Sequence, residues 1–185
     1  MCAGMCFFGK EKHVAAIACL KKALYLDSFE WIIAYNLGLV YLNTRQYASA
    51  FHFLSASINL KPDFASSYMY LAIVLSRLND FANACNAYEK AIDMEQDYMF
   101  HLVSCFYFSS FGTCRLLLFL TFSAQSAQNY AITLLRNDQV SRAEAEFRSF
   151  QKMFKILDSS AQGVDADVVK QSEILEKYFA STKQR

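Results

Sequence analysis

The sequence has very few residues that interrupt helices, with one proline and five glycines among 185 residues. Sheet sandwiches and barrels need turn residues at short intervals, so this scarcity argues against a loop-rich β fold. Apolar residues make up 55% of the chain and charged residues only 19%. The composition therefore predicts an all-α protein built from long helices.

The sequence also lacks the patterns of nucleic-acid binding and catalysis. Its net charge is +1 and no long basic block occurs, so it has no electrostatic footprint for nucleic acid. It contains no GxxxxGKS/T, GxGxxG, HExxH or GxSxG motif. His13, His52 and His101 lie near no cysteine or carboxylate in a catalytic arrangement, and the six cysteines form no CxxC pair. We expect no catalytic residue, no metal site and no cofactor, and reduced thiols rather than disulfides.

Small and large apolar residues recur at an interval of 34 residues. In the stretch 31–64 the recurring residues are Leu37, Gly38, Tyr41, Ala50, Leu54, Ser57 and Pro62. One interval earlier lie Gly4 and Ala16, and one interval later lie Leu71, Ala72, Ala84 and Tyr88. This order is typical of the tetratricopeptide repeat, a pair of antiparallel helices that buries its apolar faces against neighbouring pairs. We predict a right-handed solenoid of about 3.5–4 helical hairpins, in which Gly38 lets its helix approach Ala50 closely.

The repeat interval sets the expected boundaries along the chain. Residues 1–98 hold a partial first repeat, 1–30, and two whole repeats, 31–64 and 65–98. A hydrophobic insertion at 99–128 follows, then the remainder of the last repeat at 129–157, and a linker with a C-terminal capping helix at 158–185. Ala143 and Phe147 mark the second helix of the last repeat. Because the first repeat begins inside its first helix, we interpret the chain as a fragment of a longer repeat protein or the product of a gene model that starts late.

The insertion admits three interpretations. Residues 100–122 are largely apolar and long enough to span a bilayer, but Arg115 lies near their middle, where a charge costs about 2.5–3.5 kcal/mol. Residues 103–128 can instead be translated intron, since their first two codons can read GTAAGT and their last CAG. An ordered or flexible inserted segment is the third interpretation. We favour the intron, because removing 103–128 brings Ala84 and Ala143 to within one residue of the repeat interval.

Two stretches carry a more specific resemblance. Residues 4–26, GMCFFGKEKHVAAIACLKKALYL, and 35–63, YNLGLVYLNTRQYASAFHFLSASINLKPD, resemble the Bardet–Biedl syndrome 4 family of tetratricopeptide proteins, which are subunits of the BBSome. The resemblance covers about residues 4–97 and 129–157, the C-terminal part of that family's repeats.

The resemblance implies a non-catalytic scaffold or adaptor in ciliary membrane-protein trafficking and cilium assembly. The implied partners are other BBSome subunits and centriolar-satellite or dynactin-type proteins. The implied locations are the cytoplasm, the cilium, its basal body or the centrosome, and centriolar satellites. Contact with a membrane would be indirect unless residues 100–122 are a real span.

The partner-binding surface can be predicted from the repeat geometry. In stacked hairpins the first helices line the concave groove, and Leu37, Gly38 and Tyr41 take the packing positions of one such helix. The remaining stripes should face the groove: Tyr35, Leu39 and Asn43 in one repeat, and Met69, Ile73 and Arg77 in the next. Some of these side chains can instead pack against the adjacent helix. A groove of this composition suits a helix or extended peptide segment of another protein.

An alternative function is a cytosolic peptide-binding module of the co-chaperone type. Such modules grip a C-terminal carboxylate with basic and asparagine side chains on successive first helices. Asn36 and Asn129 occupy a suitable position, but Tyr70 stands at the matching position of the third repeat. The clamp is therefore incomplete, and we favour the trafficking scaffold.

Overall fold

The computed structural model of the chain describes residues 2–10, 12–105, 112–158 and 166–182. All regular secondary structure in these ranges is helical: α1 (Cys2–Gly9), α2 (His13–Leu26), α3 (Trp31–Asn43), α4 (Tyr47–Leu60), α5 (Ala65–Arg77), α6 (Phe81–Cys105), α7 (Gly112–Arg136), α8 (Val140–Asp158) and α9 (Ala166–Thr182). The all-α prediction is confirmed. The chain forms two compact units, Met1–Met94 and Glu95–Arg185, and the boundary between them falls inside α6.

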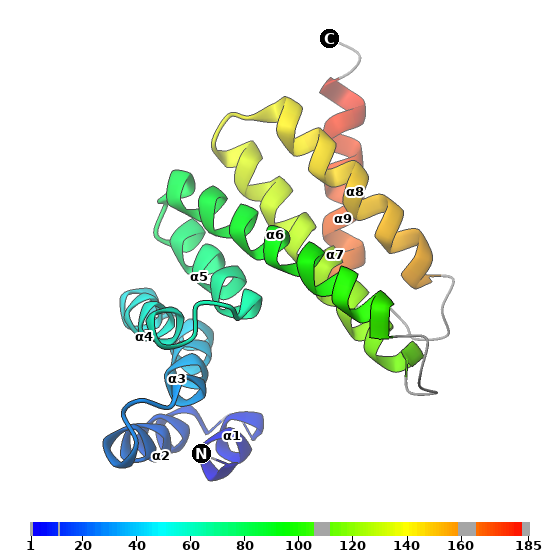
Figure 1. Ribbon diagram of the computed structural model, residues 1–185. Helices are drawn as coiled ribbons and strands as arrows, with labels where there is room; N and C mark the ends of the chain where they lie inside the picture. The colour runs from blue at the N-terminus through cyan, green and yellow to red at the C-terminus, as the bar shows by residue number, and fades with distance from the viewer. Residues whose placement is uncertain (1, 11, 106–111, 159–165, 183–185) are drawn as a thin grey trace. The chain divides into compact units, whose positions relative to one another are not determined.

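The first unit is a row of helical hairpins. Helix α1 packs on α2 and α3 packs on α4, while α2 contacts α3 and α4 contacts α5, so each hairpin adjoins the next along the chain (Figure 1). The centre of the row is built from side chains with no exposed surface: Ala16, Leu20, Leu37, Val40, Ala50, Leu54 and Val74. These buried residues line one face of each helix, so each helix is stabilised mainly by packing that face against its neighbours.

The turns inside the second, third and last hairpins share one geometry. Arg45, Asn79 and Asp138 each adopt a left-handed backbone conformation, with φ of 60°, 64° and 57°. The amide after the left-handed residue donates to a carbonyl five residues earlier: Gln46 to Tyr41 at 2.9 Å, Asp80 to Leu75 at 3.0 Å, and Gln139 to Leu134 at 2.9 Å. This pattern is the Schellman motif, which satisfies carbonyls at a helix C-terminus. The repeat geometry therefore resumes in the last hairpin, beyond the extra residues.

Glycine permits a close helix approach in the first two hairpins. A Cβ atom on Gly38 would lie 2.6 Å from Cγ of Leu54, and one on Gly4 would lie 2.7 Å from Cγ of Leu20. The prediction that Gly38 allows a close approach is thus correct, but the side chain that fills the space is Leu54 rather than Ala50. Leucine reaches across because it projects one helical turn beyond the alanine on the same face.

The helices flanking the insertion are longer than the repeat pattern predicts. The pattern ends the second helix of the third repeat near residue 94, but α6 continues to Cys105. The pattern restarts the last hairpin at residue 129, but α7 already begins at Gly112. Residues 106–111, in the middle of the apolar stretch 100–122, lie outside the described residues. The domain boundaries and the origin of residues 103–128 remain predictions.

The second unit is centred on the α7–α8 hairpin, against which α9 packs. Phe147 of α8 stacks on Phe179 of α9 with ring centroids 5.4 Å apart, and Gln128 of α7 donates to the Val168 carbonyl at 3.0 Å. Leu175 and Phe179, four residues apart, are both 6% exposed, so they form the buried face of α9. The neighbouring Ile174 is 60% exposed, because it lies about a quarter-turn away from Leu175 around the helix.

Candidate interaction groove on the first helices

The predicted groove stripes lie on α3 and α5, the first helices of the second and third repeats. Tyr35, Leu39 and Asn43 are four residues apart on α3, so they share one side of that helix. Helices α3 and α5 contact each other, and Tyr35 of this side meets Tyr70 of α5. Tyr35, Leu39 and Ile73 are half-buried, and Asn43 and Arg77 are exposed.

Met69 does not behave as a groove residue. Only 1% of its surface is exposed, so it packs inside the protein and cannot contact a partner as the protein stands. The reason is that a long apolar side chain gains more from complete burial than from facing a half-open groove. The remaining five groove residues are still predictions, with accessible surface that a partner could cover.

An aromatic cluster occupies the start of α3 and the start of α5. The ring centroids of Trp31 and Phe64 are 4.7 Å apart, those of Tyr35 and Phe64 are 5.2 Å apart, and those of Tyr35 and Tyr70 are 5.9 Å apart. The Tyr35 pairs are edge-to-face, the arrangement that aromatic quadrupoles favour. The cluster therefore joins two successive repeats through their first helices.

The cluster is uncharged at neutral pH, and one cation lies at its edge. Burial raises the pKa of Tyr35 far above its usual value and also raises the pKa of Tyr70, because a buried phenolate would lose hydration. Lys61 Nζ lies 5.8 Å from the centroid of Trp31 and 3.2 Å from a carboxylate oxygen of Asp63. The hydrogen bond from Lys61 lowers the pKa of Asp63. The site is thus suited to apolar and aromatic side chains rather than to phosphates.

Three residues of this cluster were not predicted from the sequence as binding residues. These residues are Trp31, Phe64 and Tyr70, and they pack in the cluster with Tyr35, which the sequence predicted as a groove residue. The i, i+4 spacing of Trp31 and Tyr35 was visible in the sequence. The contacts with Phe64 and Tyr70 depend on how one repeat stacks on the next, which the sequence alone did not determine.

The residues considered for a carboxylate clamp offer few accessible donors in the first unit. Asn36 is only 7% exposed, so its amide is largely withdrawn from any ligand. Tyr70, at the matching position of the next repeat, belongs to the aromatic cluster. Asn129 is half-buried on α7, in the other unit.

The described ranges contain neither a cluster of metal ligands nor a helix suited to cross a membrane. In these ranges no group of three or more histidine, cysteine, aspartate or glutamate side chains is placed to hold a metal ion. None of the helices, over its described residues, combines the length and the hydrophobicity needed to cross a bilayer.

Comparison with known sequences identifies the class of protein. Residues 33–64 and 65–98 match the sequence model of the tetratricopeptide repeat. A solved structure, MamA 41-end from Desulfovibrio magneticus RS-1, has the same fold with a TM-score of 0.66 at 18% identity, over 84% of this chain and 73% of that chain. Together with the recurring hairpins, these matches show that residues 33–98 hold two tetratricopeptide repeats and that the described chain has a tetratricopeptide-type helical fold.

Among proteins of this class, the chain is similar to BBSome complex member BBS4. It is 40% identical to the mouse protein over 173 residues, which are 93% of this chain and 28% of the mouse protein. It is 57% identical to the Xenopus tropicalis protein over 93 residues, which are 50% of this chain and 18% of that protein. The resemblance seen in the two repeat stretches is thereby confirmed. The chain spans less than a third of the length of these curated relatives.

Proposed function

We propose that this chain is a non-catalytic protein-interaction scaffold that contributes to a BBSome-type complex in ciliary membrane-protein trafficking. The observation that carries the proposal is the aromatic cluster of Trp31, Tyr35, Phe64 and Tyr70 on the first helices. Such a surface presents large, half-buried rings with little conformational entropy to lose, which is typical of protein interfaces. The similarity to BBSome complex member BBS4 supports the choice of complex.

The proposed groove continues from this cluster along both helices. Leu39 and Ile73 extend the apolar surface, and Asn43 and Arg77 give it a polar end. A peptide segment of another BBSome subunit, or of a centriolar-satellite or dynactin-type protein, would lie here with apolar side chains toward the cluster. The corresponding places of action are the cytoplasm, the ciliary base and the cilium.

The co-chaperone alternative has less support. It requires several accessible donors on successive first helices, whereas Asn36 is largely buried and Tyr70 is an aromatic residue in the cluster. A carboxylate brought into this surface would lose hydration with few charged groups to replace it. A peptide ending in a carboxylate should therefore bind weakly, if at all.

Reconstitution with purified BBSome subunits tests the proposal. The chain should be retained by one or more subunits in a pull-down. Leu39→Asp and Arg77→Glu should each reduce this retention, while His52→Ala, at an exposed position on α4, should not. Retention of chaperone tail peptides without any BBSome subunit would contradict the proposal and favour the alternative.

A further inference from the structure

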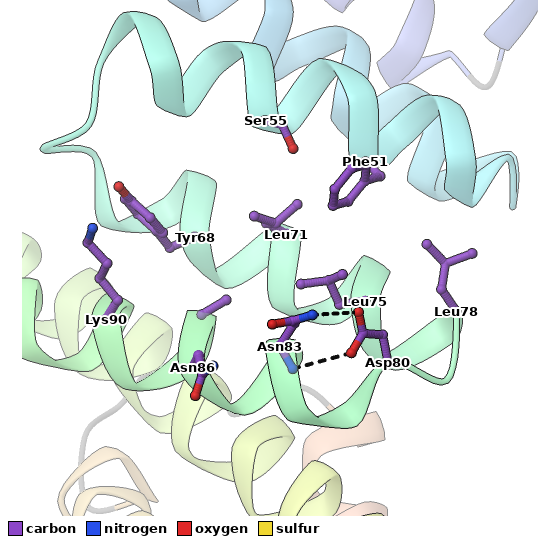
Figure 2. Close-up of a pocket in the computed structure, with 11 residues that line it drawn as sticks. Phe51, Ser55, Tyr68, Leu71, Leu75, Leu78, Asp80, Asn83, Asn86 and Lys90 are labelled. Atoms are coloured by element: carbon purple, nitrogen blue, oxygen red, sulfur yellow. Dashed lines mark hydrogen bonds between the residues drawn. The ribbon is translucent and has the colours of Figure 1, made fainter.

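A second surface lies on the opposite side of α5 from the groove. Here α4, α5 and α6 enclose an open pocket of about 530 Å³ (Figure 2). The α5 residues at this pocket are Tyr68, Leu71 and Leu75, roughly half a helical turn away from Ile73 and Arg77. A partner in the pocket would therefore not compete with one in the groove.

The floor of the pocket is apolar. Tyr68, Leu71, Leu75 and Leu78 follow one another at intervals of three, four and three residues, so they form a single ridge along α5. Phe51 of α4 lies above this ridge, with 41% of its surface exposed, and Leu78 is 44% exposed (Figure 2). Covering these side chains would remove apolar surface from water, which favours an apolar occupant.

The two ends of the pocket carry opposite charges. Lys90 lies at one end with its Nζ 4.9 Å from the ring centroid of Tyr68, and Asp80 lies at the other end beside Leu78 (Figure 2). The Asp80 carboxylate accepts one hydrogen bond from the backbone amide of Asn83 at 3.3 Å and one from the side-chain amide of Asn83 at 2.8 Å. A carboxylate has about four acceptor sites, so Asp80 retains capacity for a further donor. Ten residues separate Asp80 from Lys90 along α6, a distance of about 15 Å.

The walls determine which backbone conformation suits the occupant. All three walls are helices, whose backbone donors and acceptors are already bonded within each helix. An extended peptide would find no ladder of backbone partners here, unlike at a sheet edge. A helix satisfies its own backbone, and side chains at i, i+3, i+7 and i+10 span about the same 15 Å.

We propose that this pocket binds a short amphipathic helix of another protein, which carries an acidic side chain at its N-terminal end, apolar side chains in its middle and a basic side chain at its C-terminal end. The acidic residue meets Lys90, the apolar residues cover Phe51 and Leu71, and the basic residue meets Asp80. This order of charges also suits the helix dipole, so the partner helix runs parallel to α5. The pocket is thus a second interaction surface, independent of the groove in the proposed function.

The test uses synthetic helical peptides and the full chain. One fluorescein-labelled peptide places glutamate, leucine, leucine and lysine at i, i+3, i+7 and i+10, and a second peptide exchanges the two charged residues. Fluorescence anisotropy should show binding of the first peptide, with the exchanged peptide weaker by roughly fivefold or more. No binding of the first peptide up to about 1 mM would overturn the proposal.

Variants of the chain locate the binding. Phe51→Asp should weaken binding by about tenfold, because it places a charge in the apolar centre. Lys90→Glu should reduce the affinity for the first peptide about fivefold and increase the affinity for the exchanged peptide. Lys22→Glu, an exposed position on α2 with the same change in charge, is the matched control and should leave both affinities unchanged. Equal effects of Lys22→Glu and Lys90→Glu would overturn the proposal.

Binding in the pocket can be separated from binding in the groove, from unfolding and from self-association. Leu39→Asp in the groove should leave peptide binding unchanged, so a failure of this proposal is separable from a failure of the proposed function. Circular dichroism should show that Phe51→Asp and Lys90→Glu melt like the unaltered chain, since both side chains are exposed. A chain that sediments as a dimer and becomes monomeric in Phe51→Asp would identify a second copy as the occupant and would also overturn the proposal.

Discussion

Replacing Gly38 by alanine should destabilise the protein, although alanine is the better helix former. In an open helix position this change gains about 1 kcal/mol. At Gly38 the new methyl group would lie 2.6 Å from Cγ and 2.9 Å from Cδ2 of Leu54, whereas ordinary contacts are 3.4–4 Å. Leu54 has no exposed surface, so it cannot turn into solvent. Overpacking of a buried site costs about 1–3 kcal/mol, and we expect a net loss of about 1 kcal/mol.

Urea denaturation followed by far-ultraviolet circular dichroism measures this change. Gly9→Ala is the matched control, because a methyl group at Gly9 would meet no atom within 4 Å beyond its own stretch of helix. This control should leave the midpoint unchanged or raise it. If Gly38→Ala raised the midpoint as much as Gly9→Ala, the steric reasoning would be refuted.

A double-mutant cycle isolates the contact between Gly38 and Leu54. Leu54→Ala alone should cost about 2–5 kcal/mol, because it leaves a cavity in the centre of the hairpin. In that background the methyl group of Gly38→Ala has room, so the second change should be neutral or stabilising. Simple additivity of the two changes would mean that the two side chains do not compete for the same space.

Three further changes test other parts of the first unit. Ser57→Ala should lower the free energy of unfolding by about 1–3 kcal/mol, because the buried hydroxyl of Ser67, which lies 3.2 Å from Ser57 Oγ, loses its hydrogen-bond partner. Adding Ser67→Ala removes the unpaired hydroxyl and should restore much of the lost stability, measured as the urea midpoint. Arg45→Gly should raise the free energy of unfolding by about 0.5–1 kcal/mol and so raise the urea midpoint, since the left-handed φ of 60° is strained for arginine and not for glycine. Stability should fall as the pH rises above about 10, because Tyr35 loses its proton more easily when unfolded. Tyr35→Phe should make that fall shallower in melts between about pH 9 and 12.

The repeat positions were predictable because their physical cause is local and periodic. Ala16, Ala50, Ala84 and Ala143 all have no exposed surface, as their spacing implied. A small residue at such a position is needed wherever two antiparallel helices cross closely, and a 34-residue interval repeats that need. Asp80 caps α6, since its carboxylate accepts a hydrogen bond from the backbone amide of Asn83, as an acidic residue at a helix N-terminus commonly does.

The groove and the pocket were less predictable, because they depend on how neighbouring repeats stack. Helical periodicity placed Tyr35 and Met69 on equivalent stripes, yet Tyr35 is half-buried among aromatic rings and Met69 is almost wholly buried. The sequence pattern also gave no sign that Lys90 and Asp80 would end a pocket floored by Leu71 and Leu75. Both surfaces arise where helices of successive repeats meet, and periodicity along one helix does not specify such a meeting.

The last hairpin indicates why a repeat protein can tolerate extra residues beside it. Asp138 has the same left-handed turn as Arg45, although the two residues are not separated by a whole number of repeat intervals. Their separation is two intervals of 34 residues plus 25 further residues. Ala131 and Phe147, at the positions of Gly38 and Leu54, are buried as those are. The α7–α8 hairpin therefore contains within itself the turn and the small-to-large pairing that the repeat requires. Because each hairpin depends on its own crossing and its neighbours, added residues outside that crossing alter the chain's length without altering the local repeat geometry.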